Sequence, residues 1–357
     1  MRKPILLIIG SLATSVSALV MGSEITIVSL GVLNQPALAK AYYAPFRDAT
    51  ATKIAAFTYD DLSFVRDMVA AWKPTWDVVE VAASDLVRGC EDGLFEKLDY
   101  SRIGSKGSFV AGSAGDCGIG MSVSSMVLAY DPAKVKDAPS SWADFWNLEK
   151  YPGPRALRRS ARYTLEIALL ADGVAPRDVY KMLATRAGVD RAFRKLDRIK
   201  AEVRWWQAPS QPSVWLALGD VAMSSSEAFW IDSARAHGKE LEIVWNGNLY
   251  EVNSWAIPKH APHVADAYRF IAFASKAENQ KVFAESIAYG PTNSGTVGLL
   301  DATLAGTLPA GDNLKAAFAI DESFWAQRGK ALEERFEKWA PPIRRQQDEE
   351  DDEDYTP

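Results

Sequence analysis

The stretch Ile25-Thr26-Ile27-Val28-Ser29-Leu30 opens the pattern that decides the fold, because it is an apolar run rich in β-branched residues. Residues 36–50 follow with apolar side chains at helical spacing. Two further apolar runs, 53–57 and 76–81, are separated by a second helical pattern. Strand, helix, strand, helix and strand in this order predict a mainly parallel sheet with helices on both faces.

The helical pattern between the second and third runs is expected to begin at Asp61, whose side chain can cap a helix. Apolar residues then recur at helical spacing and predict the buried face of this helix. These residues are Phe64, Val65, Met68, Val69 and Trp72.

The α/β pattern repeats after residue 130, and an apolar strand at 254–258 is expected to cross back to the first half. The length of 357 residues suits two lobes. We expect lobe 1 at 23–129 with 254–292, and lobe 2 at 130–250 with C-terminal helices at about 300–342. A strand at 126–130 is expected to lead out of the first half, and further strands are expected at 203–206, 221–224 and 241–245. The helices of this part are expected within 140–146, 164–200 (broken at 173–176), 214–218, 262–285 and 312–340.

The two ends of the chain are distinct in composition. Arg2 and Lys3 precede a short apolar stretch, which predicts a signal peptide over 1–22; a membrane anchor is the alternative. Residues 345–357 are rich in Asp and Glu, and like charges that repel one another predict a disordered tail.

Charge and motif content argue against several functions. The net charge of −6 and the absence of a basic patch disfavour nucleic acid as a partner. The three histidines do not have metal-ligand spacing, and no nucleophile elbow or P-loop is present. We therefore expect no enzyme activity, no metal and no cofactor, although a carboxylate pair such as Glu227 and Glu251 would leave a secreted hydrolase as an alternative.

Arginines cluster in residues 153–162. The favoured interpretation is a solvated basic rim, and the alternative is recognition of an acidic ligand or partner. The only two cysteines, Cys90 and Cys117, are expected to form a disulfide in an exported protein.

Several segments in order resemble the extracellular solute-binding proteins of the spermidine/putrescine type, which serve ABC importers. The resemblance covers residues 24 to 340. The segments that carry it are 44–50 (APFRDAT), 76–79 (WDVV), 88–99 (RGCEDGLFEKLD), 116–120 (DCGIG), 128–131 (LAYD), 141–146 (SWADFW), 163–166 (YTLE), 255–259 (WAIPK) and 289–293 (YGPTN).

The resemblance implies a two-lobed, type II periplasmic binding protein-like α/β fold whose lobes close on a small ligand about a hinge. It also implies a periplasmic location, an ABC transporter permease as partner and a disulfide between Cys90 and Cys117. We expect a monomer. A sensor that reports to a membrane receptor is the alternative to a transport role.

Candidate ligand-binding residues come from the cleft positions of this fold. Glu227 follows a strand, Glu251 and Asn253 precede the crossing strand, Tyr59 ends the second strand, and Trp206 offers an aromatic face. Ser84, Ser124 and Tyr163 are implied by family position. Acids and aromatics typical of polyamine sites are partly replaced, so an amine-bearing or zwitterionic solute fits better than a long polycation.

Overall fold

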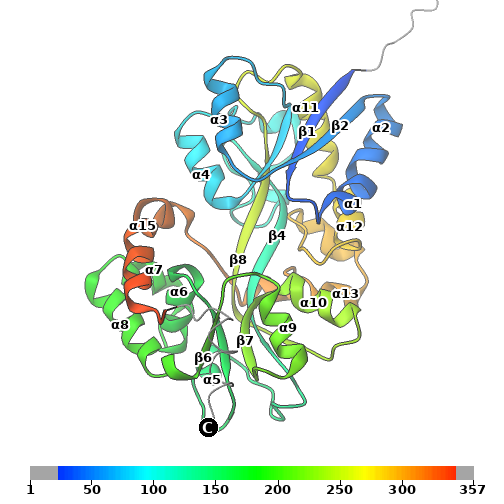
Figure 1. Cartoon of the computed structure of the whole chain (residues 1–357). Coiled ribbons are helices and arrows are strands. Elements are labelled where there is room, and N and C mark those ends of the chain that lie inside the picture. The colour runs from blue at the N-terminus through cyan, green and yellow to red at the C-terminus, as the bar shows by residue number, and fades with distance from the viewer. Residues whose placement is uncertain (1–22, 343–357) are drawn as a thin grey trace, which may run out of the picture.

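The computed structural model describes residues 23–342 and contains two lobes joined by two long strands (Figure 1). The expected signal peptide, 1–22, and acidic tail, 345–357, lie outside the described residues. One sheet runs through both lobes in the order β2-β1-β3-β8-β4-β7-β5-β6, with β9 beside β8. The strands are β1 (Glu24–Leu30), β2 (Lys53–Tyr59), β3 (Val78–Val81), β4 (Ile119–Tyr130), β5 (Arg155–Arg158), β6 (Val203–Trp206), β7 (Met223–Glu227), β8 (Glu242–Ala256) and β9 (Phe318–Ala319).

The helices flank this sheet, and their order along the chain follows the expected α/β alternation. The α-helices are α1 (Gln35–Leu38), α2 (Ala44–Thr50), α3 (Ser63–Ala70), α4 (Ala83–Glu91), α5 (Trp142–Phe145), α6 (Ala161–Ala171), α7 (Val179–Leu183), α8 (Arg186–Asp197), α9 (Gln211–Leu218), α10 (Ala228–Ala236), α11 (Val264–Ala274), α12 (Ala277–Ala284), α13 (Ala302–Thr307), α14 (Asp312–Lys315) and α15 (Glu322–Trp339). The π-helix η1 (Ala39–Tyr43) joins α1 to α2, and short 3₁₀ helices are η2 (Tyr100–Arg102), η3 (Lys106–Ser108), η4 (Pro176–Asp178), η5 (Lys200–Glu202) and η6 (Ser294–Leu299).

The first three strands confirm the α/β prediction, since β1 pairs in parallel with both β2 and β3. The sheet as a whole is mixed, because the parallel pairing predicted from the first three strands holds for them while the long strands β4 and β8 pair antiparallel with their neighbours. β8 pairs antiparallel with β3 and β4, and β4 pairs antiparallel with β7. The physical reason is that β4 and β8 run in opposite directions through the middle of both lobes, which local periodicity does not reveal.

The segments predicted as separate strands at 241–245 and 254–258 belong largely to one strand, β8. It pairs with β4 from Ile119 opposite Trp255 to Tyr130 opposite Glu242. Polar residues between the two apolar ends hid this continuity from the sequence pattern. Ladder pairing with β4 keeps that polar part extended. The paired strands form the link between the lobes (Figure 1).

Each lobe has its own apolar core, which is the arrangement that permits hinge motion. Phe46, Trp255 and Phe270 pack in the first lobe, where the Phe46 and Phe270 rings meet edge to face at 5.4 Å. Trp206 and Phe336 belong to the core of the second lobe. α15 therefore packs on the second lobe although it lies at the end of the described chain.

The predicted buried face of the helix after Asp61 is partly wrong. Val65 is buried, but the side chains of Phe64 and Trp72 are 56% and 73% exposed. α3 ends at Ala70, and Trp72 has φ of 54°, so the helical period does not extend to it. Trp72 instead stacks on the ring of His260 with 3.9 Å between ring centres.

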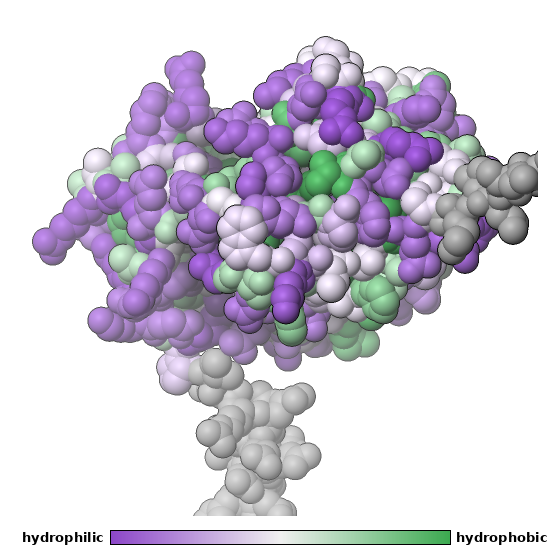
Figure 2. Space-filling model, turned by 90° about the horizontal axis from the view of Figure 1, so that it is seen from above, coloured by the Kyte–Doolittle hydropathy of each residue, from purple (hydrophilic) through white to green (hydrophobic). Residues whose placement is uncertain are grey.

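The first lobe contains the disulfide expected between Cys90 of α4 and Cys117, whose Cα atoms are 6.1 Å apart. Figure 2 views this lobe from above and shows hydrophobic residues as separate spots on a mostly hydrophilic surface. Within residues 23–342, none of the helices combines the length and apolar character needed to span a bilayer.

Candidate functional site

A cleft of about 550 Å³ opens between the two lobes, close to the crossing strand β8. α4 of the first lobe lines one side, and the strand ends of the second lobe and α15 line the other. The lining residues are Ser84, Arg88, Arg158, Arg162, Tyr163, Glu227, Glu251, Trp325, Ala326, Lys330 and Glu333.

Topology places two charged residues of the cleft at the carboxyl ends of neighbouring strands. Arg158 is the last residue of β5 and Glu227 is the last residue of β7. β5 and β7 pair in parallel, so both ends lie at the same edge of the sheet. This edge is where open α/β sheets bind ligands.

Arg158 is held by aromatic rings. Its guanidinium carbon lies 5.3 Å from the centre of the Tyr163 ring and 5.8 Å from that of Trp206. Among the residues that the structure describes, no carboxylate forms an ion pair with Arg158 and no acceptor takes a hydrogen bond from its guanidinium. Its donors are therefore available to a carboxylate that enters the cleft.

Glu227 supplies a carboxylate to the same cleft as the guanidinium of Arg158. Burial raises the pKa of Glu227, Arg158 acts in the opposite direction, and the nearby Glu251 raises it further. Within residues 23–342 no donor hydrogen-bonds to its carboxylate. A half-buried carboxylate without a partner is a favourable acceptor for an ammonium group.

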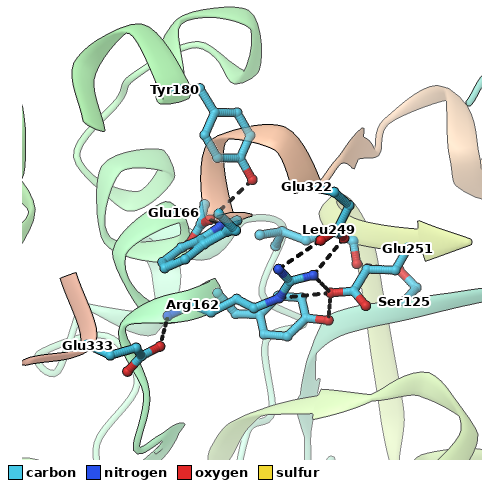
Figure 3. A network of polar contacts seen from close by, with 10 residues as sticks. Ser125, Arg162, Glu166, Tyr180, Leu249, Glu251, Glu322 and Glu333 are labelled. Atoms are coloured by element: carbon cyan, nitrogen blue, oxygen red, sulfur yellow. Dashed lines mark hydrogen bonds and ion pairs between the residues drawn. The ribbon is translucent and has the colours of Figure 1, made fainter. Parts of the chain in front are cut away.

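The carboxylate of Glu251 already has a partner, because the guanidinium of Arg162 donates hydrogen bonds to two carboxylates, those of Glu251 and Glu322 (Figure 3). The Nε atom of Arg162 donates to Oε1 of Glu251 at 3.1 Å, and Nη2 donates to the same oxygen. The Nη1 and Nη2 atoms donate to Glu322 of α15 at 3.0 and 2.6 Å. The hydroxyl group of Tyr163 also donates to Glu251. The charge of Glu251 is thus compensated inside the protein.

α15 also fixes the start of α6. Glu333 accepts hydrogen bonds from Oγ of Ser160 at 2.7 Å and from the backbone N–H groups of Ala161 at 2.9 Å and Arg162 at 3.1 Å. Tyr163 follows with φ of 69° and ψ of −44°, a backbone conformation rare for a residue with a side chain. Such strain costs about 1–3 kcal/mol and persists only where the surroundings enforce it.

A buried acid lies behind this network (Figure 3). Glu166 accepts hydrogen bonds from Nε1 of Trp325 at 2.7 Å and from the hydroxyl group of Tyr180 at 3.1 Å. Burial raises the pKa of Glu166 to about 7, while these hydrogen bonds lower it. The indole N–H links α15 to α6 and helps to hold Trp325 against the cleft.

Four of the eight residues predicted to bind ligand line the cleft together: Ser84, Tyr163, Glu227 and Glu251. Ser124 lies opposite Glu251 in the β4–β8 ladder. Trp206 is fully buried beneath Arg158, and its indole N–H donates to Ser225.

Tyr59 and Asn253 contact Glu80 instead of lining this cleft. The Tyr59 hydroxyl donates to the backbone carbonyl of Glu80 at 2.6 Å, and Nδ2 of Asn253 donates to its carboxylate at 3.1 Å. The N–H group of Leu30 donates to the other carboxylate oxygen at 3.2 Å. Burial raises the pKa of Glu80 to about 7, although both carboxylate contacts lower it.

The arginine cluster is not a solvated rim, so that interpretation is wrong. Arg155 is fully buried and donates to the backbone carbonyls of Phe145, Tyr151 and Gly153. Arg158 and Arg162 line the cleft. The sequence offered a signal here, since recognition of an acidic ligand was the alternative interpretation of the same stretch. No comparable signal marked Trp325, Lys330 and Glu333, which come from a helix far along the chain.

Within the described part of the chain, no group of three or more His, Cys, Asp or Glu side chains has an arrangement that would hold a metal ion.

Comparison with known proteins identifies the family of the chain. The family described as bacterial extracellular solute-binding protein matches residues 41–302. The chain belongs to this family. The solute-binding protein is 47% identical over 331 residues to the γ-aminobutyric acid-binding protein of Pseudomonas aeruginosa, covering 92% of this chain and 94% of the relative.

Solved structures give the same fold. An ABC transporter substrate-binding protein from Bradyrhizobium japonicum has a TM-score of 0.80 and 31% identity, with 90% of this chain and all of that chain covered (100%). The Atu4243–GABA receptor has a TM-score of 0.79 and 29% identity, with 90% and 99% covered. These relatives are solute-binding proteins and not enzymes, and the present chain is a substrate-binding protein of an ABC transporter.

The likeness to polyamine-binding proteins is more distant. The spermidine/putrescine-binding periplasmic protein of Escherichia coli is 26% identical over 182 residues, about half of either chain (50% and 48%). The family resemblance seen in the sequence is therefore confirmed at the level of solute-binding proteins and not at the level of polyamine specificity.

Proposed function

We propose that this solute-binding protein captures a small zwitterion with one ammonium and one carboxylate group, of the γ-aminobutyric acid class. One observation carries the proposal: within residues 23–342, neither the guanidinium of Arg158 nor the carboxylate of Glu227 has an ion-pair partner in the cleft. A ligand with both charges satisfies each of them, whereas a ligand with one charge leaves the other without a partner.

Two relatives support this ligand class, since the P. aeruginosa relative and the Atu4243 receptor are both named for γ-aminobutyric acid. A diamine such as putrescine fits the charges of the cleft poorly. Its second ammonium would meet Arg158 of like charge, or Glu251, whose charge Arg162 already compensates.

The proposed mechanism is closure of the lobes about β4 and β8. Ligand held by Arg158 and Glu227 of the second lobe would draw in α4, which carries Ser84 and Arg88 of the first. Differential contact with the closed form shifts the equilibrium toward it. The closed monomer would then deliver its ligand to an ABC permease at the inner membrane, after export to the periplasm by the signal peptide proposed at 1–22.

Calorimetric titration with four compounds of equal chain length tests the ligand class: γ-aminobutyric acid, butyrate, n-butylamine and putrescine. We expect γ-aminobutyric acid to bind at least about tenfold tighter than either singly charged analogue, because each charge-assisted hydrogen bond contributes roughly 1.5–3 kcal/mol. Tighter binding of putrescine, or no binding of the zwitterion, would reject the proposal.

A further inference from the structure

The guanidinium of Arg162 occupies an environment with the chemistry of an organic-cation site. Two carboxylates, Glu251 and Glu322, face it, with side chains that are only 17% and 12% exposed. The rings of Tyr163 and Trp325 have their centres 5.5 and 5.9 Å from the guanidinium carbon. Acids combined with aromatic faces are what proteins use to bind ammonium groups.

The side chains of Glu251, Glu322, Tyr163 and Trp325 form a cage around the guanidinium, and this cage opens on the ligand cleft. Arg162, Tyr163, Glu251 and Trp325 all line the same cavity as Arg158 and Glu227. The cleft therefore has two positions that attract a cation: Glu227, which has no partner among the described residues, and the cage. An internal cation already fills the cage.

We infer that Arg162 is a specificity-determining residue. Its guanidinium occupies the position that a second ammonium group of a ligand would take, so the cleft accepts only ligands with a single ammonium group. This inference rests on the proposed function, because it explains why a zwitterion is accepted and a diamine is not. Without the guanidinium, Glu227 would remain at one position of the cleft and Glu251 at the other. Glu322, which lines the adjoining pocket with Glu251, would also lose its contact with Arg162.

The charges around Arg162 support this assignment. Its single positive charge contacts two part-buried carboxylates, so removal of the guanidinium leaves both without a counter-ion. A buried carboxylate that loses its partner is unfavourable unless a new cation replaces it. The second ammonium of a diamine is such a replacement, and neither n-butylamine nor γ-aminobutyric acid carries one.

The test compares putrescine with n-butylamine, since their affinity ratio measures the contribution of the second ammonium alone. In the wild-type protein we expect putrescine to bind little or no tighter than n-butylamine. In Arg162→Met, putrescine should gain roughly ten- to a hundredfold over n-butylamine, the effect of one charge-assisted hydrogen bond. Arg191→Gln is the matched control, because it removes a guanidinium paired with Asp172 on the surface of the second lobe, and its ratio should equal that of the wild type.

An unchanged ratio in an Arg162→Met protein that unfolds cooperatively would overturn the inference. If this variant does not fold, Arg162→Met with Glu322→Gln carries the test, since it removes one carboxylate and keeps Glu251. Failure of both variants to fold would assign Arg162 to stability alone and would equally overturn the inference. A wild-type protein that does not bind γ-aminobutyric acid would reject the proposed function, while the putrescine ratio would still decide the role of Arg162.

Discussion

Arg162 of α6 and Glu251 of the crossing strand β8 form a part-buried ion pair, with Nε of the arginine 3.1 Å from a carboxylate oxygen. In the same cleft, Arg158 and Glu227 have no such partners in the described chain. The cleft thus contains one ion pair that is formed within the protein, and two opposite charges that have no partner in the described chain. Under the proposed function, this difference determines which ligand charges the cleft accommodates.

Glu227→Gln should weaken γ-aminobutyric acid binding by roughly ten- to a hundredfold, because the ammonium loses a charged acceptor. Glu149→Gln, at an exposed position outside the cleft, is the control and should leave the affinity unchanged. Isothermal titration calorimetry measures both. Equal affinities for the two variants would show that another group receives the ammonium.

Arg158→Gln should affect the opposite end of the ligand. Binding of γ-aminobutyric acid should fall by roughly ten- to a hundredfold, whereas binding of n-butylamine, which lacks a carboxylate, should not fall. Competition titrations with the two compounds separate these effects. A parallel loss for both ligands would mean that Arg158 supports the cleft and does not bind the carboxylate.

Replacing Cys90 and Cys117 by serine should lower the free energy of unfolding by about 3 kcal/mol, since the disulfide restrains a loop in the unfolded chain. Urea unfolding of the oxidised wild type and of the double variant measures the difference. Reduction of the wild type should reproduce the loss. Identical midpoints for all three samples would contradict the prediction.

The stability of the protein should fall as pH rises from about 5 to about 7.5. Burial raises the pKa of Glu80 to about 7, so the folded state retains a proton that the unfolded state, with an ordinary pKa near 4.5, has released. The stabilising contribution is complete below about pH 4.5 and is lost as pH rises through about 7.

Glu80→Gln removes this titration, so the decline with pH should be smaller by up to about 3 kcal/mol. The slope is the quantity to measure, by urea unfolding at several pH values, because the substitution also alters contacts with Leu30 and Asn253. Glu166, whose pKa burial also raises to about 7, should maintain part of the decline in the variant. A variant with the same slope as the wild type would show that Glu80 does not titrate in this range.

The local pattern of the sequence was sufficient for the first three strands and for the presence of helices between them, but not for α4. The apolar run at 25–30 lies in β1, with Ile25, Ile27 and Val28 fully buried. It was also sufficient to place Glu227 at a strand end that faces a cleft. These features depend on the spacing of residues close together in the chain, which determines backbone conformation and burial.

Other features were beyond the sequence because they depend on residues far apart in it. Arg162 meets Glu251 and Glu322 only after β8 has crossed between the lobes and α15 has packed against α6. Whether a charge is free or already paired is a property of that packing. The sequence by itself determined that this chain has α/β lobes and that an acid, Glu227, follows a strand of the second half. Only the tertiary structure decided that, among the residues it describes, Arg158 and Glu227 have no ion-pair partner while Glu251 has one, since an ion pair requires its two groups within a few ångströms of each other.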